Sequence, residues 1–497
     1  MLVSNLEMRA SEEAAFAQGV KVEALMEVVG AAVAKIVNQF YPHPGRLMVF
    51  GGKGNNTGDA LVAARLLVNR GWHAQFRCAF PEEMLGELPS LKLMEFRQSV
   101  LAQQNSPLHL SGAPLVVLDG ILGIGTNGPP CMEICVAINQ IHHLREAGAW
   151  VLAIDIPTGL DADSGLPSAF CVAADLTATV GFVKRGLVAD TATNYVGRLA
   201  LITLIELPPG KGDPAELITP CFLKHWLSPR QFNSHKGLYG RVGILAGSRC
   251  YPGAARLCVH AALRAGAGVV MLFLQEKLGL YLSMVASLPP EAIVLPIRSF
   301  NEIFQQCLDA LCIGPGIEEE EGAEEILEIV RNAQMPTVVD AGALNIVSRQ
   351  PQVLRACRGL RLLTPHPGEF TRLSPELAKL PRREAAEAFV SGCPAVTLLL
   401  KGARAIVAEM DTPPLINSTG NPGMGSAGMG DVLTGVCGSL LAQGLTPRQS
   451  ASVGTWLCGR AAEIAIFSHG QSPQSLLAGD IVQLLGQAFG SLHQGTY

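Results

Sequence analysis

The feature that most constrains the fold is a series of short, uninterrupted apolar runs. Each is followed by a glycine-rich or acidic turn, as in Leu47–Phe50, Leu115–Leu118 and Val151–Ile154, and the plan begins again at Arg241–Ala246. A strand that is apolar at every position is buried on both faces, which is typical of a parallel sheet covered by helices. The sequence therefore predicts an α/β protein, whose ligands bind beyond the carboxyl ends of the strands.

A chain of 497 residues is too long to form one ordinary hydrophobic core, so its length predicts two or three domains. The polar, Pro/Gly-rich stretch Pro208–Pro220 is interpreted as a linker, and the predicted domains are residues 1–215 and 216–497. Apolar residues make up 48% of the chain and charged residues 16%, which favours a large buried fraction and a homo-oligomer.

Charge and hydropathy exclude several classes of protein. The net charge is −5 with no basic block, so neither nucleic acid nor an anionic membrane is an expected partner. The longest apolar runs, such as Leu115–Leu122 and Val269–Leu274, are strand-sized, whereas a spanning helix needs ~20 apolar residues. Residues 1–13 carry no signal-peptide pattern, and the 13 cysteines form no CxxC pair. We expect a cytoplasmic protein that acts on small molecules.

Three polar loops follow apolar strands in the first half. Gly51–Asp59 has glycines and two asparagines before an amphipathic run at 59–69, and Asp119–Pro129 and Asp155–Leu160 follow the next two strands. Glycines allow close backbone approach, a helix start offers free N–H groups, and Asn, Asp and Thr oxygens suit a hard cation. The first loop is neither a Walker A nor a GxGxxG sequence. The alternatives are that it is only a tight turn and that Asp119 and Asp155 only cap helices.

These loops resemble those of NAD(P)H-hydrate epimerases, and the likeness extends to Lys184–Leu187, over about the first 205 residues. The resemblance implies a Rossmann-like three-layer domain, with a potassium ion held by Asn56, Asp119 and Thr158 and with Asp155 as the catalytic acid/base. The residues implied to contact the hydrated dinucleotide are Asn55, Asn56, Thr57, Gly58, Asp59, Gly123, Ile124, Gly125, Thr126, Asn127, Gly128, Pro129 and Asp155.

Three departures from the epimerase pattern bear on activity. Thr57 and Ala60 stand where that family usually has glycine, and Ile124 alters the second loop. If position 57 needs a positive φ, threonine there costs ~1 kcal/mol or more and weakens the site.

The second half contains a glycine-rich segment, Asn421–Asp431, that leads into Val432–Gly435. Such a loop at a helix start binds phosphates through backbone N–H groups, and an acid in the first turn can accept a proton from a hydroxyl. The alternative is that Asp431 only caps the helix.

Other segments of this half agree with a nucleotide-dependent site. Lys401–Ala405 forms a turn between strands, His366 lies between two prolines, and Gly316 follows the strand Leu311–Ile313. Gly253-Ala254-Ala255 opens a predicted helix that runs to Ala265, and Asp340 is either a ligand or the cap of the helix at Leu344.

Together these segments resemble ribokinase-like ADP- or ATP-dependent NAD(P)H-hydrate dehydratases, from about His235 to Gly486. The resemblance implies Asp431 as the catalytic base and Mg²⁺ with ADP or ATP as co-substrate. Residues implied to contact the hydrate are Ala255, Gly316, His366 and Asp431. Residues implied to bind the nucleotide are Lys401, Gly402, Ala403, Arg404, Ala405 and Gly430. Departures from the pattern are Glu318, Gly342, Ala405 and Met429.

Both resemblances predict repair of hydrated NADH and NADPH. The first domain would interconvert the R and S hydrates, and the second would use ADP to dehydrate the S hydrate back to NAD(P)H. The alternatives are a ribokinase-like small-molecule kinase and a nucleotide-binding protein with a decayed epimerase site.

Overall fold

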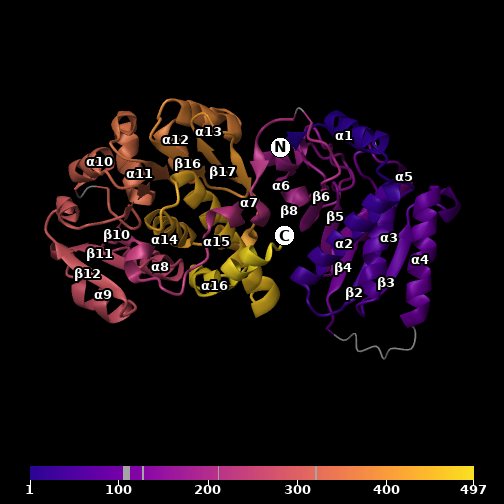
Figure 1. The fold of residues 1–497 in the computed structure, drawn as a ribbon, viewed down its shortest axis with the longest axis horizontal. Helices are drawn as coiled ribbons and strands as arrows, with labels where there is room; N and C mark the ends of the chain where they lie inside the picture. Colours follow the sequence, from indigo (N-terminus) through magenta and orange to yellow (C-terminus); the bar gives the residue numbers. More distant parts are fainter. Residues whose placement is uncertain (104–111, 126–127, 211, 320–321) are drawn as a thin grey trace. The chain divides into compact units, whose positions relative to one another are not determined.

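The computed structural model describes residues 1–103, 112–125, 128–210, 212–319 and 322–497. The chain divides into two compact units, Met1–Leu217, with which Tyr497 is grouped, and Ile218–Thr496. Each unit has a large sheet flanked by helices (Figure 1). Among the described residues no helix has the length and apolar character needed to cross a membrane.

The first unit is built on a six-stranded parallel sheet in the order β3-β2-β4-β5-β6-β8. Its strands are Arg46–Gly51 (β2), His73–Cys78 (β3), Leu115–Gly120 (β4), Trp150–Ile154 (β5), Leu176–Val180 (β6) and Arg198–Ile202 (β8). The apolar runs of the sequence form its centre, where β4 lies between β2 and β5 and Leu118 is fully buried. A short pair, Leu2–Val3 (β1) and Val183–Lys184 (β7), lies outside this sheet.

Helices cover both faces of that sheet. On one face Met132–Glu146 (α5) packs Ile138 and Ile141 against Val117 and Val151. The helix Asn55–Val68 (α3) lies on the other face. Neighbouring residues of β2 face opposite sides of the sheet: Phe50 belongs to the cluster with α5, whereas a Cβ on Gly51 would contact Thr57 of α3. The helices Val22–Phe40 (α2) and Glu87–Gln103 (α4) pack beside α3, and Asn5–Ala17 (α1) precedes them.

The second unit contains a sheet in the order β12-β11-β10-β13-β14-β15-β16-β17-β18. Pairs from β12 to β16 are parallel, and β17 and β18 are antiparallel to their neighbours. The strands are Arg241–Leu245 (β10), Val269–Gln275 (β11), Ala292–Ile297 (β12), Ala310–Ile313 (β13), Thr337–Val339 (β14), Arg361–Leu363 (β15), Val396–Leu400 (β16), Ala405–Glu409 (β17) and Leu415–Asn417 (β18).

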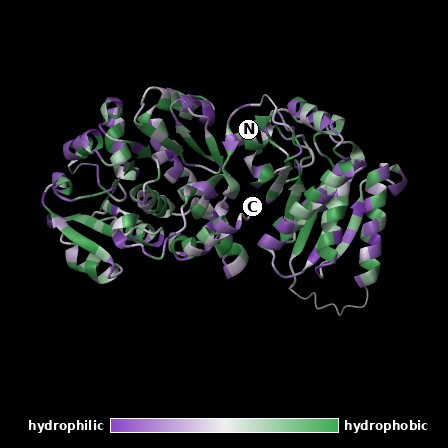
Figure 2. Ribbon diagram, in the orientation of Figure 1, coloured by the Kyte–Doolittle hydropathy of each residue, from purple (hydrophilic) through white to green (hydrophobic). Residues whose placement is uncertain are grey.

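Two separate cores show that this sheet also is covered on both faces. Neighbouring residues of β10 belong to different cores, Ile244 to one and Leu245 to the other. The first core includes Pro252–Arg264 (α8), Met429–Ala442 (α14), Pro447–His469 (α15) and Ala478–Gln494 (α16). The second includes Ala323–Asn332 (α10), Ala341–Arg349 (α11), Pro367–Leu373 (α12) and Arg382–Ser391 (α13). Figure 2 shows predominantly hydrophobic strands and helices of mixed hydropathy.

The predicted α/β class with parallel sheets is therefore confirmed. One boundary was wrong, because α3 begins at Asn55 and not at Asp59. Gly54 is the extended N-cap, so Asn56 and Thr57 belong to the first helical turn and not to a loop. Thr57 stabilises this early start, since its hydroxyl accepts a hydrogen bond from Gly52 N at 2.8 Å.

Candidate active sites

The predicted polar residues of the first unit converge at the carboxyl ends of β2, β4 and β5. Asn56 connects them, since its amide nitrogen donates to the carbonyl of Leu122 at 2.9 Å and to that of Ile154 at 3.1 Å. Parallel strands bring these loops to one edge of the sheet, as predicted from the continuous apolar runs that precede the loops.

Asp119 and Thr158 form a buried pair at this edge. The Thr158 hydroxyl donates to Asp119 Oδ1 at 2.7 Å, and Thr158 N donates to Asp119 Oδ2 at 2.8 Å. Burial raises the pKa of Asp119 to about 6, against the hydrogen bonds from Thr158, which lower it. Asp119 is the fifth residue of β4, and the next helix has Cys131 at its N-cap, so Asp119 is not a helix cap.

Of the two polar atoms in the Asn56 side chain, only the amide nitrogen makes hydrogen bonds to the described residues. Its Oδ1 atom is buried and has no hydrogen-bond partner among the described residues. Leaving such an acceptor unpaired costs about 1–3 kcal/mol. Together with the carboxylate of Asp119 and the hydroxyl of Thr158, this oxygen forms a donor set that fits a hard cation.

Asp155 lies directly after β5 in a left-handed backbone conformation with φ of 68°. Its Oδ1 accepts a hydrogen bond from Lys184 Nζ at 2.5 Å, and its Oδ2 accepts one from Ile124 N at 3.3 Å. Lys184 is fully buried and also donates to the carbonyl of Val180 at 2.7 Å. An L-residue in this conformation is strained, so the surrounding contacts must hold the carboxylate in place.

Lys184 and Glu12 are residues of this site that the sequence prediction missed. Burial raises the pKa of Glu12, and the charge of Asp155 raises it further while Lys184 opposes. The helix α1 that carries Glu12 is attached to the second loop, because Arg9 Nη2 donates to the carbonyl of Ile124 at 2.9 Å. The resemblance covered Lys184, but lysine is seldom buried and nothing in its neighbours marks it as an inward side chain.

Asp59 joins the same group of charges from α3. Burial raises its pKa well above the usual value, and the charges of Asp155 and Glu12 add to this effect. Three carboxylates and Lys184 therefore act on one another at this edge of the sheet.

The expectation that Thr57 strains the loop is wrong. Among the described residues, the non-glycine residues with positive φ are Asp155, Ala341 and Asp411. Thr57 is helical and fully buried, and its hydroxyl donates to the carbonyl of Gly120 at 3.0 Å. Threonine thus links α3 to the end of β4.

The remaining predicted contacts surround Asp155 in different ways. A Cβ on Gly123 would lie 3.3 Å from Asp155 Oδ2, so this glycine passes close to the carboxylate. Ile124 is nearly buried, whereas Asn55 is exposed. Gly58, Gly125, Gly128 and Pro129 are described, but Thr126 and Asn127 lie outside the described residues.

In the second unit, Asp340, Lys401 and Asp431 come together from three different elements. Lys401 Nζ donates to Asp340 Oδ1 at 2.9 Å, and the hydroxyl of Thr434 donates to Asp340 Oδ2 at 2.8 Å. Asp340 occupies the N-cap position of α11, but its side chain makes no capping hydrogen bond. Of the two alternatives for Asp340, the structure excludes a side-chain cap.

Asp431 lies in the first turn of α14, after the left-handed Gly428. Gly430 allows the helix start to approach Lys401, because a Cβ at this position would lie 3.2 Å from Lys401 Nζ. Burial raises the pKa of Asp431 to about 6, and the charge of Asp340 acts in the same direction while Lys401 opposes.

Lys401 and Asp340 stabilise each other's charged forms. Burial opposes the charge of Lys401, but Asp340 and Glu369 outweigh it and raise the lysine pKa. Burial likewise opposes the charge of Asp340, but Lys401 and the Thr434 hydroxyl outweigh it and lower the pKa of this carboxyl. Asp431 is therefore the carboxylate of this group that protonates most readily.

His366 is placed by its own local structure. Its Nδ1 accepts hydrogen bonds from Gly368 N at 3.0 Å and Glu369 N at 3.3 Å, which caps α12. About half of the His366 side chain remains exposed, at 52%. The Nδ1 atom thus has a structural task, and Nε2 lies 3.5 Å from Glu369 Oε1.

The other predicted residues of this unit lie in two places. Ala255 is buried in α8, and Gly316 has φ of 68° beside Ala254. The turn Lys401–Ala405 lies between β16 and β17, where Gly402 approaches the guanidinium of Arg382 and Arg404 is buried at 3% exposure. Gly402 and Ala403 are the exposed members of this turn.

Gly342 departs from the family pattern for a reason visible in the backbone. A Cβ at this position would lie 2.1 Å from the carbonyl oxygen of Ile317. An acidic residue therefore does not fit here without a shift of that backbone.

Comparisons with known proteins agree with this division into two sites. A family model described as NAD(P)H-hydrate dehydratase matches residues 242–484, and one described as YjeF-related protein N-terminus matches residues 22–186. A bifunctional NAD(P)H-hydrate repair enzyme Nnr from Moorella thermoacetica is 35% identical, over 95% of this chain and 93% of the relative. The enzyme of the same name from Escherichia coli is 32% identical, over 96% of this chain and 91% of the relative.

A solved structure is also similar to part of the chain. It is that of an ADP/ATP-dependent NAD(P)H-hydrate dehydratase from Bacillus subtilis, co-crystallized with ATP/Mg²⁺. It is 28% identical, with a TM-score of 0.49, over 56% of this chain and 98% of that chain.

The two α/β units, each with buried carboxylates at the carboxyl edge of its sheet, define a two-domain enzyme. On the similarity over nearly its whole length, the chain belongs to the bifunctional NAD(P)H-hydrate repair enzymes. The family and function predicted from the sequence are thereby confirmed.

Proposed function

We propose that residues 1–215 interconvert the R and S hydrates of NAD(P)H and that residues 216–497 dehydrate the S hydrate with ADP, or with ATP. The observation that carries the proposal is that each unit contains its own group of buried carboxylates at the carboxyl edge of its own sheet. Location in the cytoplasm and assembly into a homo-oligomer remain predictions.

In the first site Asp155 is the group that moves a proton at the hydrated ring. Lys184 Nζ and Ile124 N hold its two oxygens, so the carboxylate keeps one orientation toward the substrate. The loop residues from Asn55 to Asp59 and from Gly123 to Pro129 bind the dinucleotide. Holding the catalytic acid/base in the orientation that the reaction needs contributes a large part of an enzyme's rate enhancement.

A potassium ion fits the same site. Asn56 Oδ1, which is buried without a partner, Asp119 and Thr158 would hold it. When bound, the ion would supply positive charge to this site. Asn56→Ala should therefore make epimerisation insensitive to potassium while the unit stays folded, as seen by its thermal unfolding. Epimerisation that still responds to potassium in this variant would remove Asn56 from the ion site.

In the second site Asp431 accepts the proton of the substrate hydroxyl, whose oxygen then bonds to the terminal phosphorus of the nucleotide. The bond from that phosphorus to the bridging oxygen breaks, so AMP leaves when ADP is used and ADP leaves when ATP is used. Phosphate is a better leaving group than hydroxide, so the bond from the ring carbon to its oxygen then breaks, and loss of a proton from the neighbouring ring carbon to solvent forms the double bond that restores the dihydropyridine ring. The helix start at Gly430 and Lys401 provide positive charge for the transferred phosphoryl group. Ala255, Gly316 and His366 contact the hydrate, and the turn from Lys401 to Ala405 contacts the nucleotide.

Magnesium would enter this site with the nucleotide. Among the described residues no group of three or more His, Cys, Asp or Glu side chains could hold a metal ion. Mg²⁺ commonly uses one or two carboxylates together with substrate phosphates, so Asp431 and Asp340 suffice as protein neighbours.

Recovery of NADH absorbance tests the whole proposal. Hydrated NADH is incubated with the protein and ADP, or with ATP, in the presence of magnesium. We expect complete conversion of both epimers with the native protein and of one epimer only with Asp155→Asn. No recovery of absorbance with either nucleotide would contradict the proposed dehydratase.

A further inference from the structure

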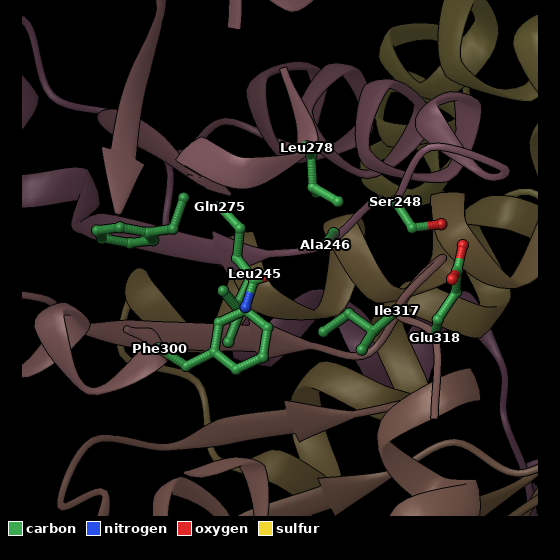
Figure 3. Close-up of a pocket in the computed structure, with 10 residues that line it drawn as sticks. Leu245, Ala246, Ser248, Gln275, Leu278, Phe300, Ile317 and Glu318 are labelled. Atoms are coloured by element: carbon green, nitrogen blue, oxygen red, sulfur yellow. The ribbon is translucent and has the colours of Figure 1, made fainter. Parts of the chain in front are cut away.

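The two units differ in what lies beside their proposed sites without a role. In the second unit, a hollow lined in part by Ser248, Phe300 and Glu318 has room for about one or two water molecules and not for a further ligand (Figure 3). In the first unit, the helix α1 carries a carboxyl group, that of Glu12, to which the proposed function gives no role.

Glu12 lies on the inward face of α1. The buried residues of this helix are Met8, Ser11 and Ala15, and Glu12 lies one helical turn from both Met8 and Ala15. Residues three or four positions apart share one face of a helix, so Glu12 belongs to the face that is packed against the rest of the unit. Its side chain is half-buried, whereas that of the next residue, Glu13, is exposed.

The same helix is attached to the loop that holds Asp155. Arg9, one helical turn before Glu12, donates from Nη2 to the carbonyl of Ile124 at 2.9 Å. The backbone N–H of Ile124 in turn donates to Asp155 Oδ2 at 3.3 Å. One residue of the loop therefore contacts both α1 and the proposed acid/base.

The segment that carries Lys184 is also in contact with this end of the chain. The strand β1, directly before α1, pairs with β7 so that Val3 lies opposite Lys184. A Cβ on Gly181, in the turn before β7, would lie 2.7 Å from Cε of Met8, which shares the inward face with Glu12. The inward face of α1 thus lies against both partners of the buried ion pair.

Charges around Glu12 decide which carboxyl group of the site keeps a proton. The charged groups that face it are Arg9, Glu13, Asp59, Asp155 and Lys184. Burial raises the pKa of the Glu12 carboxyl, and the charge of Asp155 raises it further, while Lys184 opposes. Because Lys184 donates directly to Asp155 at 2.5 Å, it stabilises the negative charge there. Of these two carboxyl groups, Glu12 is therefore the one that holds a proton more readily.

The chemistry of the hydrate requires two groups that handle protons. When water adds to the enamine of a dihydropyridine ring, the hydroxyl is bonded to the carbon next to the ring nitrogen. The R and S hydrates differ at this carbon, so their interconversion requires one of its bonds to break and form again. The bond to nitrogen breaks when a base removes the hydroxyl proton and an acid protonates the nitrogen.

We propose that Glu12 is the catalytic acid of the epimerase and that it works together with Asp155 as the base. This inference rests on the proposed function of the first unit. Asp155 takes the hydroxyl proton, the electron pair of the carbon–nitrogen bond moves to the nitrogen, and Glu12 gives its proton to that nitrogen, which forms a ring-opened aldehyde. Rotation about the adjacent carbon–carbon bond presents the other face of the aldehyde to the nitrogen. When the nitrogen bonds to it again, its proton returns to Glu12 and the proton of Asp155 returns to the oxygen.

The test uses the full chain and the purified R hydrate without nucleotide, and it measures the appearance of the S hydrate. Glu12→Gln keeps the size of the side chain but has no proton to transfer, so epimerisation should fall by about 10²-fold. Glu13→Gln is the matched control, because it changes the next carboxylate of the same helix, which is exposed, and it should leave the rate unchanged. Dehydration of the S hydrate with ADP should be the same in both variants and in the native protein.

Stability and pH distinguish a catalytic acid from a structural residue. Glutamine has no charge for burial and Asp155 to disfavour, so Glu12→Gln should unfold at the same temperature as the native protein or at a higher one. Epimerisation by the native protein should fall as the pH rises through the raised pKa of Glu12, because the carboxyl group then loses the proton that it donates. The residual epimerisation by Glu12→Gln should not show this fall.

Three results would overturn the inference while the proposed function stands. They are a native rate in Glu12→Gln, a loss of epimerisation that is matched by a loss of stability, and a fall at high pH that persists in this variant. If the native protein does not interconvert the hydrates, the proposed function of the first unit is wrong and this inference with it.

Discussion

The two units hold their principal carboxylates in opposite ways. Asp155 of the first unit is strained and directly paired, with Lys184 at 2.5 Å. Asp431 of the second unit lies in a regular helical turn, and the nearby Lys401 donates to Asp340 at 2.9 Å. In the first unit the lysine holds the principal carboxylate itself, whereas in the second unit the lysine pairs with a neighbouring carboxylate, Asp340.

This difference suits two kinds of proton transfer. A carboxylate held by an ion pair and backbone N–H groups keeps one orientation, which suits reversible exchange at a single atom. A carboxylate whose pKa is raised to about 6 by burial and by Asp340 is a stronger base than an ordinary aspartate. In the second unit the surroundings of Asp431 increase its basicity, whereas in the first unit the surroundings of Asp155 fix its orientation.

The largest expected effect separates the two units completely. Asp431→Asn removes the proposed base, so dehydration should fall ~10²-fold or more, while epimer interconversion and nucleotide binding stay near the native values. Turnover of the S hydrate, exchange between epimers and nucleotide binding by calorimetry are measured on one preparation. Near-normal dehydration in this variant would remove Asp431 from its proposed role.

The pH dependence sharpens the same contrast. The base works in its ionised form, and burial raises the pKa of Asp431 to about 6. The rate of dehydration should therefore be constant above that pH and fall as the pH drops through about 6. A profile that stays flat down to about pH 4.5, near the ordinary range of aspartate, would contradict this assignment.

Replacement of Lys184 tests whether the first site requires a fixed orientation of Asp155. Lys184→Met leaves the buried Asp155 without its cation, which should cost the first unit about 3 kcal/mol or more and abolish most epimerisation. Denaturant unfolding and epimer exchange measure the two effects. The control is Arg185→Gln, since the exposed Arg185–Glu7 pair should contribute less than about 1 kcal/mol. Full epimerase activity in Lys184→Met would show that Asp155 does not depend on this ion pair.

The second unit also contains a fully buried cationic side chain, Arg361. We expect it to stabilise the fold and to take no part in catalysis. Arg361 donates to the carbonyls of Val330 and Ala333, each at 2.6 Å, and to that of Leu360 at 2.9 Å. Arg361→Ala should leave these acceptors unpaired and cost about 2–3 kcal/mol of unfolding free energy. Dehydration per folded molecule should not change, and the exposed Arg358→Ala is the control. A loss of activity without a loss of stability would contradict a structural role.

The smallest expected effect concerns the departure at position 57. Thr57→Gly removes the hydrogen bond to Gly120 and places glycine inside α3, so we expect a loss of about 1–2 kcal/mol of stability. Epimerisation should fall or stay the same. Thermal unfolding and epimer exchange measure the two effects. A variant that is as stable as the native protein and epimerises faster would show that Thr57 lowers the epimerase activity of the native site.

Much of both sites could be predicted because parallel α/β folds place loops by a simple rule. Continuous apolar runs predict parallel strands that are buried on both faces, and the polar residues that follow such strands meet at one edge of the sheet. Asn56, Asp119, Asp155 and Thr158 accordingly meet in the structure. In the second unit the glycine-rich segment likewise correctly placed Asp431 in the first turn of a helix.

The residues that were missed depend on contacts between segments distant in sequence. Lys184 and Glu12 come from β7 and α1, and neither has a neighbouring pattern that distinguishes an inward charge from an exposed one. Asp340 was undecided between a cap and a ligand until Lys401, 61 residues later, was seen to pair with it. Thr57 was misjudged because its conformation was taken from a loop that is in fact a helix.

The sequence by itself therefore determined the class of fold, the edge of each sheet where chemistry takes place and most carboxylates at that edge. Continuous apolar runs and the polar residues that follow them suffice for these predictions, because local hydropathy indicates parallel strands and the geometry of parallel sheets brings the strand ends to one edge. Only the tertiary structure decided which cation serves which carboxylate: Lys184 holds Asp155, and Lys401 holds Asp340 beside Asp431. Ion pairing depends on distances between side chains that the order of residues along the chain does not contain.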